Sequence, residues 1–154
     1  MIQDIISSST ILLYIIPIIA FINTHNVVHI IGLLGLIGTV GLSEFIKYYI
    51  IGNKNPRPSG ASNCNLLCND GNQGGRPGMP SSHSATIGFL IGFYYQQTNN
   101  TIQIGILIYG ALVLLSRYIK QCHTFEQIVV GTLFGLFCGF FAMRLFKCLK
   151  NSLC

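Results

Sequence analysis

The chain has 154 residues, of which 51% are hydrophobic and only 8% are charged, and its formal net charge is +5. Soluble domains carry about 25% charged residues, so this composition excludes a soluble globular enzyme, a disordered segment and a nucleic-acid-binding domain. Most of the six cysteines lie in or beside apolar runs, which argues against a disulfide framework. The composition therefore predicts one integral membrane domain, residues 1–154, with no nucleic-acid partner.

Stretches without Asp, Glu, Lys or Arg define the expected membrane-spanning segments, and they cover 5–43, 77–116 and 127–143. About 20 mainly apolar residues are needed for a helix to cross a bilayer, so the first two stretches each fit a helical hairpin and the third fits one span. Because a backbone in hydrocarbon must satisfy its own hydrogen bonds, we expect an all-α membrane protein. Its bundle of about five transmembrane helices is predicted at 5–22, 27–52, 82–97, 102–118 and 124–149.

Glycines recur at helix-packing spacings in two of these predicted helices. Gly131, Gly135 and Gly139 form two overlapping GxxxG units, and Gly88 and Gly92 form another. Small residues let helices approach one another closely in lipid. The pattern mainly indicates packing inside one bundle, and a homodimer through the glycine-rich helix faces is the alternative.

Basic residues are confined to the segments 44–76 and 117–126 and to the C-terminal tail. Two predicted spans separate the first two segments, so both lie on one membrane face, and one further span places the tail on the opposite face. Six cations therefore gather at one end of the bundle, which we call the cationic end. They are Lys47, Lys54, Arg57, Arg76, Arg117 and Lys120.

The segment 53–82 is rich in Gly, Pro, Asn and Ser and is predicted to form a loop at the cationic end. It ends in Pro80-Ser81-Ser82-His83, where serine caps the free N–H groups of the next helix. At the same end, Ser116-Arg117 closes one predicted helix, and His123 begins the next after five intervening residues. Helix N-termini and cations both attract anions, so the expected ligand is a phosphate group at the membrane surface.

Three motifs in these segments resemble those of the type 2 phosphatidic acid phosphatase (PAP2) superfamily, and they occur in the same order. Pro80-Ser81-Ser82-His83 resembles its PSGH motif, and Ser116-Arg117 followed after five residues by His123 resembles its SRx5H motif. Lys47 with Arg57-Pro58 resembles its first motif, Kx6RP. The resemblance implies a membrane-embedded phosphatase that acts on a lipid phosphate and needs no cofactor and no metal.

The segments 78–84 and His123-Thr124-x-x-Gln127 look most like the dolichyl-diphosphatase branch of that superfamily. This resemblance, which extends from Leu42 to Gly135, implies hydrolysis of a polyprenyl diphosphate such as dolichyl diphosphate. Phosphatidate or a related phospholipid is the alternative substrate. A catalytically silent membrane protein that binds anionic lipid is the third hypothesis.

The resemblance also implies a role for each site residue. His123 attacks phosphorus and forms a phosphohistidine, while His83 protonates the leaving oxygen and then activates water. Arg57 and Arg117 hold the equatorial phosphate oxygens, a task for which their forked geometry is suited. The phosphate-binding residues are Lys47, Lys54, Ser81 and Ser82, and the orienting residue is Gln127.

The chain departs from the family pattern at two positions and in its number of spans. Gln127 stands where the family has Asp, four residues after the nucleophilic His, and its carbonyl can still fix the tautomer of the ring. Lys47 lies ten residues before Arg57, where the family has seven, so either three residues loop out after Lys47 or Lys54 takes its place. Five spans are predicted, where the family commonly has six.

Cys64 and Cys68 lie together in the loop, separated by three residues. Two thiols are too few for a zinc site, and a disulfide between them requires an oxidising compartment. Free thiols are the favoured interpretation of this pair.

The basic tail predicts the orientation of the chain in the membrane. Cytoplasmic segments carry an excess of Lys and Arg, and the tail has no catalytic reason for its three cations. The C-terminus is therefore expected in the cytosol, and the active site on the lumenal or external side. A protein of eukaryotic type would then lie in the endoplasmic reticulum.

Overall fold

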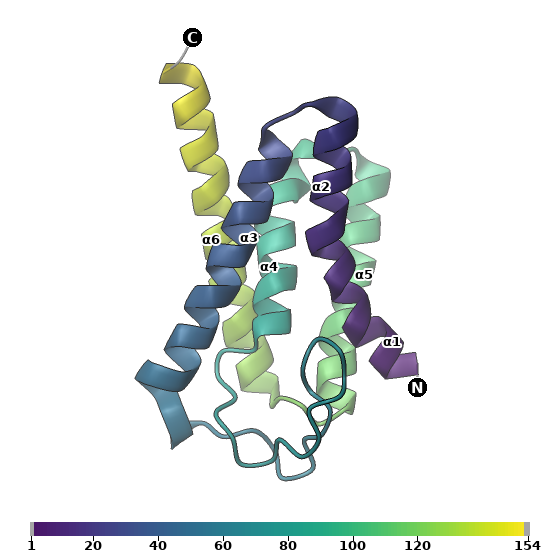
Figure 1. Cartoon of the computed structure of the whole chain (residues 1–154), viewed down its shortest axis with the longest axis vertical. Coiled ribbons are helices and arrows are strands. Elements are labelled where there is room, and N and C mark those ends of the chain that lie inside the picture. The colour runs from purple at the N-terminus through teal and green to yellow at the C-terminus, as the bar shows by residue number, and fades with distance from the viewer. Residues whose placement is uncertain (1, 153–154) are drawn as a thin grey trace.

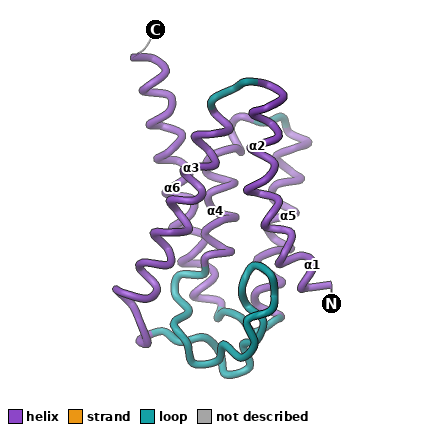
Figure 2. The backbone as a smooth tube through the Cα atoms, in the orientation of Figure 1, coloured by secondary structure: helices purple, strands orange, loops and turns teal. Residues whose placement is uncertain are grey.

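The computed structural model describes residues 2–152, and these fold into a helical bundle that contains no strand within that range (Figures 1 and 2). The predicted fold class, an all-α membrane protein, is confirmed. A long loop closes one end of the bundle, and the C-terminal helix projects beyond the other end (Figure 1). The helices are α1 (Ile2–Ser8), α2 (Leu12–Thr24), α3 (Val28–Phe45), α4 (Ser82–Tyr94), α5 (Asn100–Ile119) and α6 (Phe125–Ser152).

Four helical stretches are long and apolar enough to cross a membrane. They are Ile2–Thr24, Val28–Lys54, Asn100–Ile119 and Phe125–Lys150. In the first, α1 and α2 are joined by the 3-10 turn η1 (Ser9–Ile11). The remaining predicted span is the shorter helix α4, which continues to Gln97 through the 3-10 turn η4 (Tyr95–Gln97). Most of α4 is buried, because α3, α5 and α6 all pack against it.

Helix α3 changes its winding before it reaches the loop. It continues as a π-helical turn, η2 (Ile46–Ile51), and then as a short 3-10 turn, η3 (Gly52–Lys54). Lys47 lies on η2 and is buried, whereas Lys54 at the end of η3 is exposed. The additional residues between Lys47 and Arg57 are therefore taken up by η2 and η3, and π-helical turns of this kind are frequent at functional sites.

The most extensive helix contact joins α4 and α6, and it is made backbone to backbone through glycines. A Cβ atom added at Gly135 would collide with the carbonyl group of Ala85, and one at Gly88 would collide with the backbone of α6. The glycine spacing seen in the sequence thus serves packing inside this bundle. The contact also fixes His83, in the first turn of α4, relative to His123, just before α6.

We expect Gly135→Ala to lower the apparent melting temperature of the protein in detergent. The new methyl group would overlap the backbone of α4, and overpacking of this kind costs about 1–3 kcal/mol. Gly38→Ala on α3 is the matched control, because the added Cβ meets no atom within 4 Å, and the change from Gly to Ala in a helix stabilises by about 0.5–1 kcal/mol. Thermal unfolding followed by tyrosine fluorescence measures both, and equal melting temperatures would contradict the close contact.

Candidate active site

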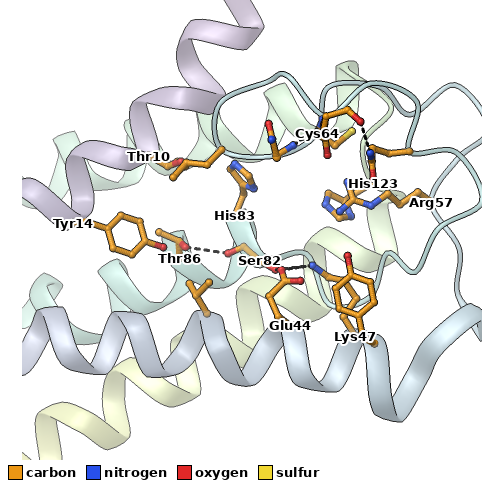
Figure 3. A pocket seen from close by; sticks show the side chains of 16 residues that line it. Thr10, Tyr14, Glu44, Lys47, Arg57, Cys64, Ser82, His83, Thr86 and His123 are labelled. Carbon is orange, nitrogen blue, oxygen red and sulfur yellow. Dashed lines mark hydrogen bonds and ion pairs between the residues drawn. The ribbon is translucent and has the colours of Figure 1, made fainter.

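A cavity of about 260 Å³ lies at the cationic end, between the loop and the helices α2, α3 and α4 (Figure 3). Side chains from segments far apart in the sequence face it. Of the residues predicted from sequence, those that line the cavity are Lys47, Arg57, Ser82, His83 and His123. The rings of His83 and His123 both point into this space, and Arg57 lies beside His123 (Figure 3).

The first turn of α4 presents His83 to the cavity. Ser81 has an extended backbone and caps the helix, because its hydroxyl accepts hydrogen bonds from the Ser84 backbone N–H at 3.4 Å and from the Ser84 hydroxyl at 2.9 Å. Ser81 is fully buried and does not line the cavity, whereas Ser82 does. Nε2 of His83 is buried and has no hydrogen-bond partner among the described residues.

Lys47 connects α3 to the start of α4 through a three-membered polar cluster. Its Nζ donates to Ser82 Oγ at 2.7 Å and to Glu44 Oε1 at 2.6 Å, and Ser82 Oγ also donates to Glu44 Oε1. A buried ammonium group needs such partners. Sequence reasoning did not assign Glu44 to the site, although its i,i+3 spacing to Lys47 is the signal that identifies helical ion pairs.

Gln127 fixes the orientation of the His123 ring. Its Nε2 donates to Asn55 Oδ1 at 2.6 Å and to the Pro56 carbonyl at 2.9 Å, so the amide nitrogen must face the loop and Oε1 must face the ring. His123 Nδ1 lies 3.1 Å from this Oε1. Because a carbonyl oxygen only accepts, Nδ1 carries the hydrogen and the Nε2 lone pair of His123 stays available.

The surroundings of His123 also fix its charge. Burial, reinforced by the positive charges of Arg57, Arg117 and Lys47, lowers the pKa of His123 well below 6.5. The hydrogen bond with Gln127 acts in the opposite direction but is the smaller effect. The imidazole is therefore neutral at neutral pH, which is the form that acts as a nucleophile.

The two predicted arginines approach the site differently. Arg57, in the loop, donates from Nε to the Pro77 carbonyl at 3.4 Å. Arg117, on α5, is fully buried and lies behind the cavity wall. Its Nη1 donates to the Ser7 hydroxyl and its Nη2 to the Cys64 carbonyl, both at 2.5 Å. Two neutral partners on different elements thus hold the Arg117 guanidinium in place.

Unpartnered buried polar atoms concentrate on the predicted catalytic residues. Four such side-chain atoms occur among the described residues, and three of them are Arg57 Nη1, Arg117 Nε and His83 Nε2. Buried polar groups in proteins are almost always hydrogen-bonded. Arg57 and His83 both line the cavity, and Arg117 lies behind its wall, so the chemistry of this end of the bundle matches an oxyanion, such as a phosphate group.

The cysteines of the loop are not the free pair expected from sequence. Cys64 forms a disulfide with Cys122, with a Cα–Cα distance of 5.5 Å, because the loop folds over the turn between α5 and α6. Cys68 remains a thiol and lies 3.4 Å from the Ser8 hydroxyl. The disulfide connects Cys64, whose carbonyl binds Arg117, to the residue that precedes His123.

Four of the six cations predicted at the cationic end do not line the cavity, and one of them is Arg117, which lies behind its wall. Lys54 and Arg76 are exposed, and Lys120 forms an ion pair with Asp4 at 2.6 Å. Lys47 is therefore the lysine that the structure brings to the site. Residues that the motifs did not identify also support it, and these are Glu44, Asn55, Ser7 and the disulfide partners Cys64 and Cys122.

Comparison with known families places this arrangement in a broader class. The sequence model of the PAP2 superfamily matches residues 28–150, which include both histidines, both arginines and Lys47. The chain therefore belongs to the PAP2 superfamily, and this membership supports a phosphatase-type function on lipid phosphates. Comparison with curated proteins and with solved structures finds no match.

We expect Gln127→Glu to lower the melting temperature and to reduce turnover. A carboxylate at this position would place an acceptor against the Asn55 and Pro56 oxygens that now receive hydrogen bonds from the Gln127 amide. Losing such partners in a buried site costs about 1–3 kcal/mol. Glu126→Gln, at the exposed neighbouring position, is the control and should match wild type. If Gln127→Glu is as stable and as active as wild type, the amide does not orient His123.

Acidification should destabilise the protein through His123. Because the pKa of His123 is lower in the folded chain than its ordinary value of 6.5, the unfolded chain binds the proton first as the pH falls. This contribution to stability is complete above pH 6.5 and is lost as the pH falls toward the folded-state pKa. Melting curves across this range should show a smaller loss in His123→Asn than in wild type. The exposed His25→Asn is the control, and parallel losses in all three proteins would refute the prediction.

Proposed function

We propose that this chain, residues 1–154, is one integral membrane phosphatase domain that hydrolyses a polyprenyl diphosphate of the dolichyl type and releases phosphate. The observation that carries the proposal is the geometry around His123. Its imidazole is neutral, its Nδ1 hydrogen is held by Gln127, and its ring points into a cavity lined by Arg57 and His83. A nucleophile, a proton donor and oxyanion-binding groups therefore share one space.

In the first step, the Nε2 lone pair of His123 attacks the terminal phosphorus, and the bond from phosphorus to the bridging oxygen breaks. A protonated His83 gives its proton to that oxygen as the lipid monophosphate leaves. The negative charge of the bound diphosphate favours this protonated form. Positive charge develops on the His123 ring, and its Nδ1–H donates to the Gln127 oxygen, which stabilises the phosphohistidine.

In the second step, neutral His83 takes a proton from a water molecule while the water oxygen attacks phosphorus. The phosphorus–nitrogen bond breaks, phosphate leaves, and His123 returns to its neutral form. Arg57, which lines the cavity, supplies donors for the equatorial oxygens in both steps, and Arg117 behind the cavity wall adds its positive charge. Preorganised donors of this kind contribute about 3–4 kcal/mol each to transition-state stabilisation. The scheme requires no metal.

The preference for a diphosphate rests on residues and on charge placement. The segment 78–84 and the Gln127 position resemble the dolichyl-diphosphatase branch. Lys47 and Ser82 line the cavity from the side of α3 and α4, whereas Arg57 lines it from the loop (Figure 3). The cavity thus offers cationic groups on two sides, which matches two linked phosphates better than one. Phosphatidate is the alternative substrate.

The same proposal orients the chain with its active site on the lumenal or external side. The Cys64–Cys122 disulfide supports this orientation, because disulfides persist in oxidising compartments. The basic residues near the end of α6 support a cytosolic C-terminus. In a eukaryotic cell the proposed location is the endoplasmic reticulum.

Phosphate release by the purified protein in detergent, with EDTA present, tests the proposal. We expect faster release from a polyprenyl diphosphate than from polyprenyl monophosphate or phosphatidate. His123→Ala should lower the rate by at least about 10³-fold, because the nucleophile is lost. The exposed His25→Ala at the other end of the bundle should retain full activity. Quenching with alkaline SDS, in which the phosphorus–nitrogen bond of a phosphohistidine survives, should trap label from terminally labelled substrate on wild type and not on His123→Ala.

Each alternative has its own signature in this assay. A preference for phosphatidate would replace the dolichyl-type substrate, and zero turnover on every lipid would favour a silent anionic-lipid binder. Loss of activity in EDTA would contradict metal independence. The orientation of the chain in the membrane is tested by measuring hydrolysis of a water-soluble short-chain diphosphate that is added to sealed microsomes. Activity should appear only after detergent is added, and full activity in intact vesicles would place the site in the cytosol.

A further inference from the structure

A second cavity, of about 210 Å³, lies inside the bundle between α2, α3, α4 and α5. Apolar side chains form nearly all of its wall, among them Leu13, Pro17, Leu36, Phe89 and Leu90. Such a space excludes water, because too few polar groups are present to hold it. The cavity lies within segments that cross the membrane, where hydrocarbon is the available ligand chemistry.

The second cavity lies next to the active-site cavity along the helices of the bundle. On each of three helices, a residue that lines the active-site cavity is followed by one that lines the second cavity, three or four positions away on the same helix face. The two cavities therefore lie end to end, and we call the two together the groove. The pairs are Tyr14 and Pro17 on α2, Val40 and Leu36 on α3, and Thr86 and Leu90 on α4.

Tyr94 lines the second cavity near the end of α4 that is remote from His83. Its ring stacks on that of His29, with ring centroids 6.5 Å apart, and a Cβ at Gly32 would collide with it. From His83 to Tyr94 the rise along α4 is about 16 Å, which is more than half of a hydrocarbon core about 30 Å thick. The groove is cationic at one end and apolar along this length, so its chemistry is that of an amphiphile with an anionic head.

We propose that the second cavity binds the hydrocarbon tail of the same lipid whose phosphate is hydrolysed, an inference that rests on the proposed function. The shared helix faces favour the substrate's own tail over a bystander lipid, because a tail attached to a phosphate beside His83 enters the groove directly. Bilayer hydrocarbon is as apolar as the cavity wall, so transfer into it gains little hydrophobic free energy. The cavity therefore acts through packing and shape and selects tails by length.

Ala20→Phe tests this assignment. Ala20 lines the second cavity from α2 and lies beyond Tyr14, away from the catalytic residues. A phenyl group there fills the space that a long tail needs and leaves the active-site cavity unchanged. We expect kcat/KM for a farnesyl or longer diphosphate to fall about tenfold, whereas kcat/KM for the one-isoprene dimethylallyl diphosphate stays at the wild-type value. An unchanged kcat/KM for dimethylallyl diphosphate also shows that Ala20→Phe is folded.

Ala111→Phe is the matched control, because Ala111 is exposed on α5 and lines neither cavity. It should leave both substrates unaffected. An equal loss on short and long tails in Ala20→Phe, or no loss on either, would overturn the tail site.

A binding measurement separates this inference from the proposed function. A long-chain polyprenyl phosphonate should raise the melting temperature of wild type and raise that of Ala20→Phe less, whether or not any diphosphate is turned over. If no diphosphate is turned over but the two proteins still differ in their melting-temperature shifts, the proposed phosphatase function is wrong and the tail site stands. If the phosphonate raises the melting temperatures of the two proteins equally, the tail site is wrong, and the proposed phosphatase function is unaffected.

Discussion

The close backbone contact between α4 and α6 is the constraint on which the candidate site depends. A Cβ at Gly131 would meet the carbonyl oxygen of Ser81, one residue before the turn that carries Ser82 and His83. The main chains at the starts of the two helices are therefore nearly in contact. Because interiors are close-packed and deform little, the separation of His83 from His123 is set by the two backbones. The glycine stripe, which the sequence associates mainly with packing inside the bundle, thus also determines how far apart the two imidazoles lie.

Around that fixed pair, the protein accumulates positive charge in a small buried volume. Lys47, Arg57 and Arg117 all lower the pKa of His123. Glu44 is the carboxylate that forms an ion pair with one of these three cations, Lys47. Unbalanced buried charge is costly, and neutral donors and acceptors from the loop and α1 offset only part of that cost. A ligand with several negative charges would balance this excess of positive charge. The excess also favours the neutral form of the His123 imidazole.

Local sequence patterns predicted the fold and five of the residues that line the candidate site, whereas the contacts that support these residues are long-range and could not be predicted. Charge-free stretches located the spans because the cost of burying charge in lipid acts on each segment separately. Glu44 was within reach of the same reasoning, through its spacing to Lys47. Ser7 and Arg117 are 110 positions apart, and Cys64 and Cys122 are 58 apart. The packing of α1 on α5 brings the first pair together and the path of the loop over the α5–α6 turn brings the second, and no periodicity encodes either arrangement.

Gln127 illustrates why a departure from a family pattern has to be judged with its surroundings. An aspartate after the nucleophilic histidine needs donors around its second oxygen, because a buried carboxylate only accepts. In this chain the loop presents the oxygens of Asn55 and Pro56 at that place, and an amide is the group that can donate to them while accepting from the ring. The glutamine and the acceptor-rich start of the loop therefore form one unit. Gly78 belongs to the same unit, since a Cβ there would collide with the Gln127 amide, and these residues together hold the His123 ring with its hydrogen on Nδ1 and without a carboxylate.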